Sequence, residues 1–232
     1  MSNEFSRTET LLGLDRMNKL KNSRVIIFGV GGVGGYVIEA LTRSSFKQID
    51  IVDFDSVSIT NINRQIIALH STVGKLKIDV MKERMLDINP NILVNTYPVF
   101  LDGTNIESFN LSQYDYVIDA IDSVTSKILL IEYCVKNNIK IISSMGTGNK
   151  LDPSLFKISD ISKTSVCPLA KVIRYELRKR GINHLKVLFS TETPIKNFVE
   201  GEGNKLAPSS ISFVPSSAGL LIASEVIKDL CL

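Results

Sequence analysis

A run of glycines near the amino end is the part of this sequence that points most directly to chemistry. Gly29, Gly31 and Gly34 have the spacing G-x-G-x-x-G, between a β-branched run at 24–28 and a helical pattern at 36–42. In a strand–turn–helix unit, the first glycine permits the tight turn, the second lets a phosphate approach the backbone, and the third lets helix and strand pack closely. Amide groups and the helix dipole then face the phosphate. The motif predicts a site for a phosphorylated ligand; a turn that only tightens the packing is the alternative.

Two carboxylates end the next strand pattern, at 48–55. Asp53 follows Gly29 at about the distance, ~20 residues, at which dinucleotide folds place the acid that holds the ribose hydroxyls. We therefore expect Asp53 to bind ribose. Capping of the following turn is the alternative for Asp53 and for Asp55.

Cationic residues follow in a polar loop and in the next helical pattern. Asn61 and Arg64 are three residues apart and share a face if the loop contains a helical turn. The guanidinium fork of Arg64 matches phosphate oxygens. Lys77 lies in the first turn of a helix expected at 75–89, where the dipole disfavours a cation, so it is expected to bind an anion. A surface charge is the alternative for Lys77.

A second group of carboxylates follows the strand expected at 114–120. Asp119 and Asp122 lie where ligands gather in parallel sheets, beyond the carboxyl end of a strand. A magnesium ion that bridges triphosphate oxygens would need a carboxylate there. Capping of the next helix by Asp122 or Ser123 is the alternative, and the two residues can divide these roles.

The elements that must position these residues alternate between strand and helix up to about residue 150. This order predicts an α/β fold with a Rossmann-like, mostly parallel sheet, helices on both faces, and additional antiparallel strands in the C-terminal third. We expect one domain over 1–232, with a nucleotide-binding half at 1–150 and a substrate-facing half at 151–232.

The flanking segments are assigned from the same patterns. A first helix is expected at 8–21 and a closing helix at 217–230. Residues 212–214 are expected to re-enter the sheet. The segment 192–210 has little periodicity and is expected to be a mobile loop.

The bulk composition limits the class of protein. The chain has 232 residues, a hydrophobic fraction of 44% and a net charge of +3, so any nucleic-acid surface must be a local patch. No apolar run approaches the ~20 residues that span a bilayer, so we expect no membrane association. The three cysteines form no C-x-x-C pair, which argues against a four-cysteine zinc site and favours the reducing cytoplasm.

A basic segment at 163–186 provides such a patch. It has seven Lys or Arg residues and one acid, Glu176, which suits a polyanionic partner. An ordinary charged helix face is the alternative. The candidate contacts to such a partner are Lys163, Lys171, Arg174, Arg178, Lys179, Arg180 and Lys186.

Together the motifs resemble one family over nearly the whole chain. GVGGVG at 29–34, DFDSVSITNINRQ at 53–65, VGKLK at 73–77 and DAIDS at 119–123 are similar to the ThiF/MoeB/HesA family, relatives of ubiquitin-activating enzymes. The family uses ATP to adenylate a carboxylate, and this activity needs every charged group named above. A nicotinamide enzyme would need only the glycine loop and Asp53.

The resemblance implies roles residue by residue. It assigns ribose to Asp53, the ATP phosphates to Asn61, Arg64 and Lys77, and Mg²⁺ to Asp122. The resemblance also implies that Arg7 is an arginine finger that enters the site of the partner subunit of a homodimer. Catalysis is thus assigned to Arg7, Arg64, Lys77 and Asp122. The expected ATP-binding set is Gly29, Gly31, Gly32, Gly34, Asp53, Asp55, Asn61, Arg64, Gln65, Lys77, Asp122 and Ser123.

Three further pieces resemble the branch of the family that dehydrates threonylcarbamoyladenosine beside the anticodon of tRNA. They are Lys127 after DAIDS, the stretch 161–182, and FSTE at 189–192. The implied chemistry adenylates the threonyl carboxylate, and the carbamoyl oxygen then displaces AMP to close a ring. A cysteine desulfurase or a sulfur-acceptor protein is a further implied partner.

Two other functions remain open at this point. One is activation of a ubiquitin-like sulfur carrier at its C-terminal carboxylate, and the other is nucleotide binding without turnover. Cys167 precedes Pro168 beside the basic segment, so a nucleophilic role is weighed against an inert thiol. Cys134, inside a helical pattern, is expected in the core.

Overall fold

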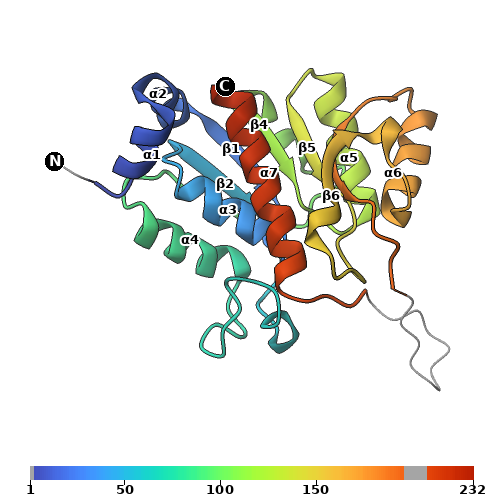
Figure 1. Cartoon of the computed structure of the whole chain (residues 1–232), viewed down its shortest axis with the longest axis horizontal. Coiled ribbons are helices and arrows are strands. Elements are labelled where there is room, and N and C mark those ends of the chain that lie inside the picture. The colour runs from blue at the N-terminus through green and yellow to red at the C-terminus, as the bar shows by residue number, and fades with distance from the viewer. Residues whose placement is uncertain (1–2, 196–207) are drawn as a thin grey trace.

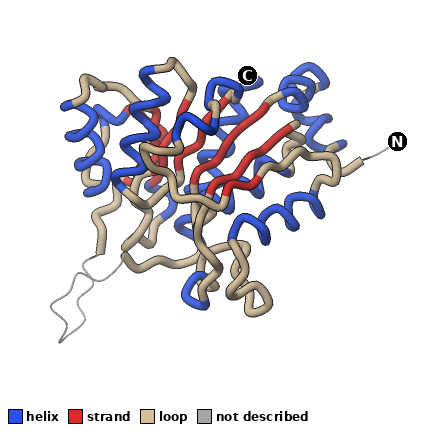
Figure 2. The backbone as a smooth tube through the Cα atoms, turned by 180° about the vertical axis from the view of Figure 1, so that it is seen from behind, coloured by secondary structure: helices blue, strands red, loops and turns tan. Residues whose placement is uncertain are grey.

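The computed structural model describes residues 3–195 and 208–232. Within these residues seven strands form one sheet, in the order β3-β2-β1-β4-β5-β7-β6 (Figures 1 and 2). The strands are β1 (Arg24–Phe28), β2 (Gln48–Val52), β3 (Thr96–Tyr97), β4 (Tyr116–Asp119), β5 (Ile141–Ser144), β6 (Phe156–Asp160) and β7 (Lys186–Ser190).

The pairing confirms the expected fold class. β1 lies between β2 and β4 in parallel register, and the parallel pairs β2–β3, β4–β5 and β5–β7 extend the sheet on both sides. β6 pairs with β7 in the antiparallel sense, so the C-terminal third adds one antiparallel edge strand. The carboxyl ends of all the parallel strands therefore meet at one edge of the sheet.

Helices cover both faces of the sheet. They are α1 (Ser6–Leu12), α2 (Leu14–Asn22), α3 (Gly34–Thr42), α4 (Lys77–Ile88), α5 (Val124–Lys136), α6 (Pro168–Lys179) and α7 (Phe213–Cys231). The short 3₁₀ turns are Ile59–Asn61, Ile106–Phe109, Leu111–Gln113, Pro153–Leu155 and Ile161–Lys163. Figure 1 shows α7 running across the front of the sheet, with α5 and α6 on its far side.

The core consists of two layers because side chains alternate across each strand. Val25 and Ile27 of β1 pack with α3, α4 and α7 in one hydrophobic cluster. Ile26 and Phe28 of the same strand pack with α5 and α6 in the other. The sheet is thus buried on both faces, as the continuous apolar strands predict.

Three local expectations were wrong or too long. The helix expected at 8–21 is two helices, because Gly13 has φ 83° and ψ 160° and interrupts the first one. Residues 212–214 begin α7 and do not re-enter the sheet, since Val214 starts a buried stripe at helical spacing. Residues 91–98 also predict a strand, of which the structure forms only Thr96–Tyr97. The loop expected at 192–210 lies largely outside the described residues.

Helix α7 braces the sheet from its C-terminal end. Asp229 accepts hydrogen bonds from the Tyr116 hydroxyl at 2.6 Å and from Lys186 Nζ at 2.7 Å. Burial and the neighbouring Asp229 raise the pKa of Tyr116, so its phenol stays neutral and donates. At the other end of α7, a Cβ on Gly32 would lie 3.2 Å from Pro215. The helix therefore links the core to the glycine loop.

Candidate active site

A cavity of about 550 Å³ lies beyond the carboxyl ends of β1, β2, β4 and β5. Its wall joins segments that are far apart in the sequence, including the glycine loop, the ends of β2 and β4, and residues 144–148. Sites assigned from the sequence that line it are Gly29, Gly31, Gly32, Asp53, Asp55, Arg64, Gln65, Lys77 and Asp122. This edge is where ligands bind in open parallel sheets.

The glycine loop is held by two very close backbone contacts. Gly29 has φ 97°, and a Cβ there would lie 2.5 Å from the carbonyl oxygen of Ala120 at the end of β4. A Cβ on Gly34 would lie 1.8 Å from the carbonyl oxygen of Gly29. Only glycine fits at either position. The structure thus confirms a tight first turn and close helix–strand packing at the last glycine of the motif.

Asp53 closes the same turn from the end of β2. Its carboxylate accepts the backbone N–H of Val30 at 2.7 Å and that of Asp55 at 2.8 Å. The capping role that the sequence left open is therefore present, and the side chain also lines the cavity. Burial raises the pKa of Asp53, while nearby Lys77 and the two N–H donors oppose that rise.

Lys77 opens helix α4 and points back across the cavity wall. Its Nζ lies 2.6 Å from Oδ2 of Asp55, and its own backbone N–H donates to the Asp55 carbonyl at 3.0 Å. The lysine side chain is only 7% exposed, whereas that of Asp55 is 46% exposed. Lys77 is therefore not a solvated surface charge, and in this structure its partner is the carboxylate of Asp55.

The polar loop after β2 is built by its own side chains. Asn61 Oδ1 accepts the backbone N–H of Ser58 at 3.0 Å, which completes a capping box around the Ile59–Asn61 turn. Arg64 Nη1 donates to the Thr60 carbonyl at 2.9 Å and to Asn63. Arg64 lines the cavity, but Asn61 does not; Asn61 holds the turn that carries Arg64.

The sequence left helix capping open for both Asp122 and Ser123, and only Ser123 takes that role. Ser123 is the N-cap of α5, and its hydroxyl accepts the backbone N–H of Ser126. Asp122 is exposed and lines the cavity. Within residues 3–195 and 208–232 its carboxylate has no hydrogen-bond or ion-pair partner. It is the acid at this edge that remains available to a cation.

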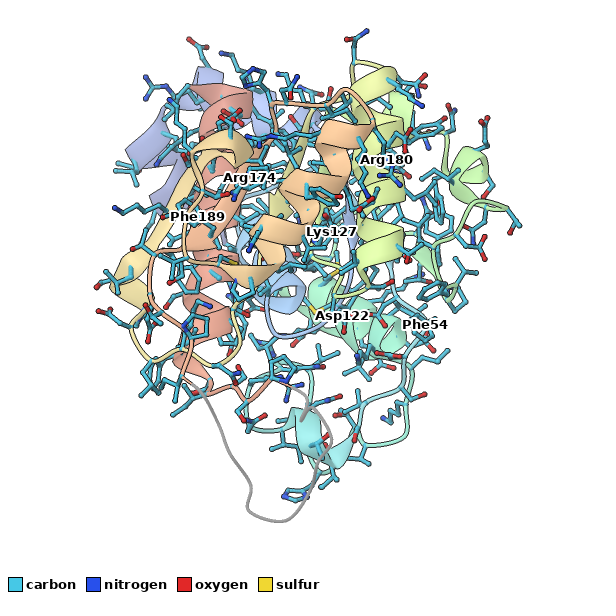
Figure 3. The ribbon with its side chains drawn as sticks, turned by 90° about the vertical axis from the view of Figure 1, so that its right-hand side faces the viewer. Phe54, Asp122, Lys127, Arg174, Arg180 and Phe189 are labelled. Carbon is cyan, nitrogen blue, oxygen red and sulfur yellow. The ribbon has the colours of Figure 1, made fainter. Side chains whose placement is uncertain are left out.

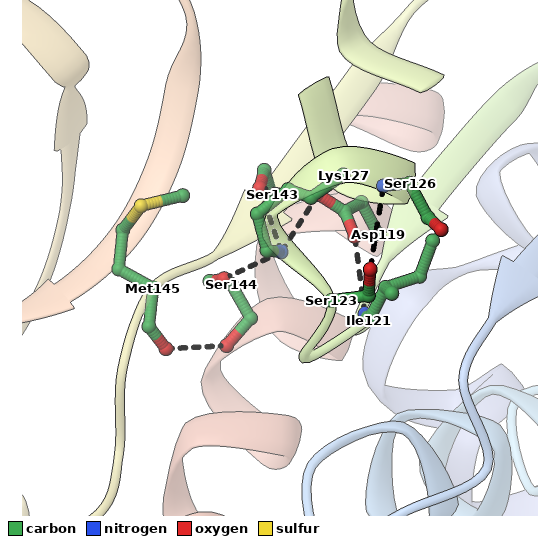
Figure 4. Close-up of polar contacts among 8 residues, drawn as sticks. All are labelled: Asp119, Ile121, Ser123, Ser126, Lys127, Ser143, Ser144 and Met145. Atoms are coloured by element: carbon green, nitrogen blue, oxygen red, sulfur yellow. Dashed lines mark hydrogen bonds and ion pairs between the residues drawn. The ribbon is translucent and has the colours of Figure 1, made fainter. Parts of the chain in front are cut away.

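Behind Asp122 lies a buried charged cluster that sequence reasoning missed (Figure 4). Lys127 Nζ lies 2.8 Å from Asp119 Oδ2, and both side chains are fully buried. The same ammonium donates to the Ser144 carbonyl at 2.9 Å and to the Ser143 hydroxyl at 3.3 Å. Asp119 Oδ1 accepts the backbone N–H of Ile121, so the cluster fixes the turn before Asp122.

The sequence contained only an indirect signal for this cluster. Lys127 served above only as one mark of a branch within the family. A lysine on α5 becomes fully buried only because the ends of β4 and β5 supply acceptors for all three of its N–H groups.

An aromatic pair at one end of the cavity was also missed. The rings of Phe54 and Phe100 meet edge to face, with centroids 5.1 Å apart. Both side chains are about half exposed and line the cavity together with Val99 and Leu101. Figure 3 places Phe54 and Asp122 on the same side of the molecule, below the start of α6. The cavity thus has an apolar end and a charged middle.

The basic segment is divided by the fold, and this corrects one expectation. Lys186 lies on the face of the sheet covered by α7, where it pairs with Glu225 at 2.8 Å and with Asp229. Helix α6 packs on the opposite face. Lys186 therefore does not belong to a common surface with the basic residues of α6, because alternate strand residues point to opposite faces.

The remaining basic residues differ in what they contact. Arg174 turns inward and donates to the carbonyl and hydroxyl of Thr164. Arg180 pairs with Glu176 at 2.9 Å and with Glu132 at 3.2 Å. The basic residues exposed to solvent without an acidic partner among the described residues are Lys163, Lys171 and Arg178.

Arg7 and the cysteines lie outside the cavity. Arg7 is exposed on α1, and none of the lining residues comes from α1. Cys167 is 2% exposed and packs in the core at the start of α6. Its burial favours the inert thiol that was weighed above. Cys134 is fully buried, as expected, and burial raises its pKa to about 12.

Residues 3–195 and 208–232 contain no group of three or more His, Cys, Asp or Glu side chains placed to hold a metal ion. The helices of this part of the chain are all too short or too polar to cross a membrane.

Known proteins resemble this chain over almost its whole length. The model of the ThiF family matches residues 5–231. A tRNA threonylcarbamoyladenosine dehydratase of Bacillus subtilis is 48% identical over 242 residues, covering 99% of this chain and 95% of that protein. A crystal structure of the Escherichia coli enzyme of that name in complex with AMP matches with a TM-score of 0.90 and 33% identity, covering 98% and 93% of the two chains. An ATP complex of the same enzyme matches with a TM-score of 0.89.

Both the sequence matches and the structural matches extend over almost the entire chain. The chain belongs to the ThiF family.

Proposed function

We propose that this protein is an ATP-dependent dehydratase that cyclises threonylcarbamoyladenosine in tRNA. The observation that carries the proposal is the convergence of Arg64, Lys77 and Asp122, from three separate elements, on one cavity with the glycine loop. A cation pair and a free carboxylate suit the departure of pyrophosphate from an adenylated carboxylate. The named function of relatives that match almost end to end supports the choice of substrate.

ATP fits the cavity in one orientation. The phosphates belong beside Gly31 and Gly32, where the N-terminus of α3 supplies amide groups and a positive dipole. Asp53, which lines the cavity at the end of β2, would bind the ribose hydroxyls. The apolar end formed by Phe54 and Phe100 suits the adenine ring.

A magnesium ion fits Asp122. Mg²⁺ is commonly bound through one or two carboxylates together with substrate phosphates, and Asp122 is an exposed carboxylate on the cavity wall. When bound, the ion would neutralise the charge that develops on the leaving pyrophosphate. Ser123 contributes indirectly, as the cap of the helix that follows.

The reaction follows from these placements in two steps. An oxygen of the threonyl carboxylate attacks the α-phosphorus of ATP, and the bond to pyrophosphate breaks. The carbamoyl oxygen then attacks the adenylated carbonyl carbon, AMP leaves, the carbamoyl nitrogen loses a proton, and the ring closes with net loss of water. Lys77 and Arg64 stabilise the phosphate charge. Because the second nucleophile belongs to the substrate, proximity replaces an enzyme nucleophile.

A homodimer with Arg7 acting in trans belongs to the same proposal. Helix α1 contains no buried residue, and Leu11 on it is 81% exposed. An exposed leucine on this helix suits contact with a second copy of the chain. Arg7 would then serve the partner's cavity, since no residue of α1 lines the cavity of its own subunit. A function on tRNA also agrees with a cytoplasmic location.

Mass analysis of nucleosides tests the reaction. Threonylcarbamoylated tRNA incubated with the protein and Mg-ATP should yield a modified adenosine lighter by one water. An ATP–pyrophosphate exchange that requires a small carrier protein and ignores tRNA would reject the proposal.

For the dimer, Arg7→Ala and Arg64→Ala are each expected to be inactive, and their mixture should recover part of the activity. No recovery in mixed dimers would reject action in trans.

A further inference from the structure

Helix α6 carries an outward stripe of basic and aromatic side chains that the site described above does not use. Ala170, Ile173 and Leu177 face the core. The opposite side presents Lys171, Tyr175, Arg178 and Lys179, which share one face at spacings of three and four residues. We call these four residues the α6 stripe.

The α6 stripe combines positive charge with an open aromatic ring. Tyr175 is 61% exposed, and Lys179 Nζ lies 4.2 Å from the centre of its ring. Lys171 and Arg178 have no acidic partner among the residues that the structure describes. Glu176 is the one acid of the helix, and its carboxylate is already paired with Lys179 and Arg180. The surface therefore keeps a net positive charge.

The stripe begins at the cavity. Leu169, the second residue of α6, lines the cavity wall. At 1.5 Å of rise per residue, the stripe extends to about 15 Å from that point along the helix axis. Figure 3 shows α6 rising from the level of Asp122 toward Arg180. A polymer whose reacting group lies in the cavity can run directly along this helix.

We propose that the α6 stripe binds the unpaired RNA strand next to the modified adenosine. Lys171 and Arg178 contact phosphates, and the Tyr175 ring stacks on a neighbouring base. Single-stranded RNA is recognised by this combination of backbone cations and aromatic platforms. The inference rests on the function proposed above and specifies where its substrate binds.

The geometry separates this stripe from the other basic residues of the segment. Arg174 is committed to Thr164, and Lys186 lies under α7 on the other face of the sheet. Arg180 lies between two glutamates. These three cations are expected to contribute little to RNA binding, although the sequence alone grouped them with the rest.

A double charge reversal tests the phosphate contacts. Lys171→Glu/Arg178→Glu should raise the Michaelis constant for threonylcarbamoylated tRNA by roughly tenfold or more. The plot of log affinity against log salt should become less steep by about 1.4, for two contacts to a single strand. ATP affinity, measured by calorimetry, should not change.

The matched control carries the same change of charge at the opposite edge of the sheet. Lys47 and Lys140 are exposed and precede β2 and β5. Lys47→Glu/Lys140→Glu should keep the Michaelis constant and most of the salt dependence. If both double variants weaken tRNA binding equally, net charge explains the effect and the stripe is not the docking surface.

Substitutions of Tyr175 test the stacking contact. Tyr175→Ala should weaken binding of an anticodon stem-loop roughly fivefold or more, while Tyr175→Phe should retain it. Equal affinity of the alanine variant and the unaltered protein would overturn the stacking contact. Loss of binding to an acidic protein partner, with unchanged tRNA turnover, would assign the stripe to a protein. Failure of the unaltered protein to dehydrate tRNA would reject the proposed function independently of every variant.

Discussion

Two lysine–aspartate pairs lie at the carboxyl edge of the sheet, and their surroundings differ sharply. In the pair at the ends of β4 and β5, Lys127 and Asp119 are both 0% exposed, and the ammonium has three acceptors. In the pair after β2, Lys77 meets Asp55, whose side chain is 46% exposed on the cavity wall. The first pair is closed to ligands, and the second is open to them.

The difference separates two uses of the same residue types. A buried lysine whose donors are all satisfied can give none to a ligand, so Lys127 serves to hold the turn before Asp122 and the carbonyl of Ser144. Lys77 is held by a partner that water and ligands can reach. We infer that phosphate oxygens replace Asp55 when ATP binds.

The largest effect on stability is expected from breaking the buried Lys127–Asp119 pair. Lys127→Met leaves Asp119 buried without its cation, which typically costs about 3–5 kcal/mol of unfolding free energy. Urea unfolding followed by circular dichroism measures this loss. Lys127→Met/Asp119→Leu should recover much of it, because no unpaired charge remains. A loss below about 1 kcal/mol in the single variant would show that the cluster tolerates an uncompensated carboxylate.

Lys77→Met should have the opposite profile. Water can hydrate Asp55, so the unfolding free energy is expected to change by less than about 1 kcal/mol. Turnover of threonylcarbamoylated tRNA should fall by roughly 10²–10³, as for loss of one preorganised donor to a developing charge. Nucleoside mass analysis measures turnover, with urea unfolding of the same variant as the control. A stability loss equal to that of Lys127→Met would remove the distinction between the two pairs.

Asp55→Asn tests directly whether phosphate oxygens of ATP replace Asp55 as the partner of Lys77. Without the competing carboxylate, Lys77 is free for phosphate, and ATP affinity should rise by up to roughly fivefold, the value of about 1 kcal/mol for a partly exposed pair. Calorimetric titration with ATP measures this change. A lower affinity would instead make Asp55 a direct contributor to the ATP site, as the family resemblance implied.

The smallest effect concerns pH and Asp53. Burial raises the pKa of Asp53 above the ordinary aspartate value. The folded state therefore binds this proton more tightly than the unfolded state. Its contribution to stability is present below the unfolded pKa and is lost as the pH rises through the folded pKa. Asp53→Asn should remove this contribution and flatten the stability profile in that window. Urea unfolding at a series of acidic pH values is the measurement, and identical profiles for both proteins would contradict the shift.

ATP affinity should show the complementary trend. The ribose is expected to need the ionised carboxylate, so affinity should decline on acidification at a pH above the ordinary aspartate value. A decline of the same shape in Asp53→Asn would assign the titration to another group.

Local patterns were sufficient to predict most elements of the fold. The β-branched run at 24–28 is strand β1 to the residue, and the helix expected at 75–89 differs from α4 (Lys77–Ile88) only at its ends. Helical and strand periodicities are local properties, so they can be recognised in a segment without knowing what it packs against. The break at Gly13 was missed although it is local, since it rests on the positive φ of that glycine. The start of α7 at Phe213 was missed because it depends on what the segment packs against.

The sequence by itself determined the glycine loop, the order of strands and helices, and the acids that follow β2 and β4. These features depend on the spacing of residue types along the chain, which the sequence gives directly. Only the tertiary structure decided which charged side chains are buried, which are exposed to solvent and which are paired with an opposite charge. Lys127 meets Ser143 and Ser144 only after β4 and β5 pair, and Lys186 is separated from α6 only because the sheet has two faces. Burial and side-chain direction arise from contacts between distant segments, and no local pattern encodes them.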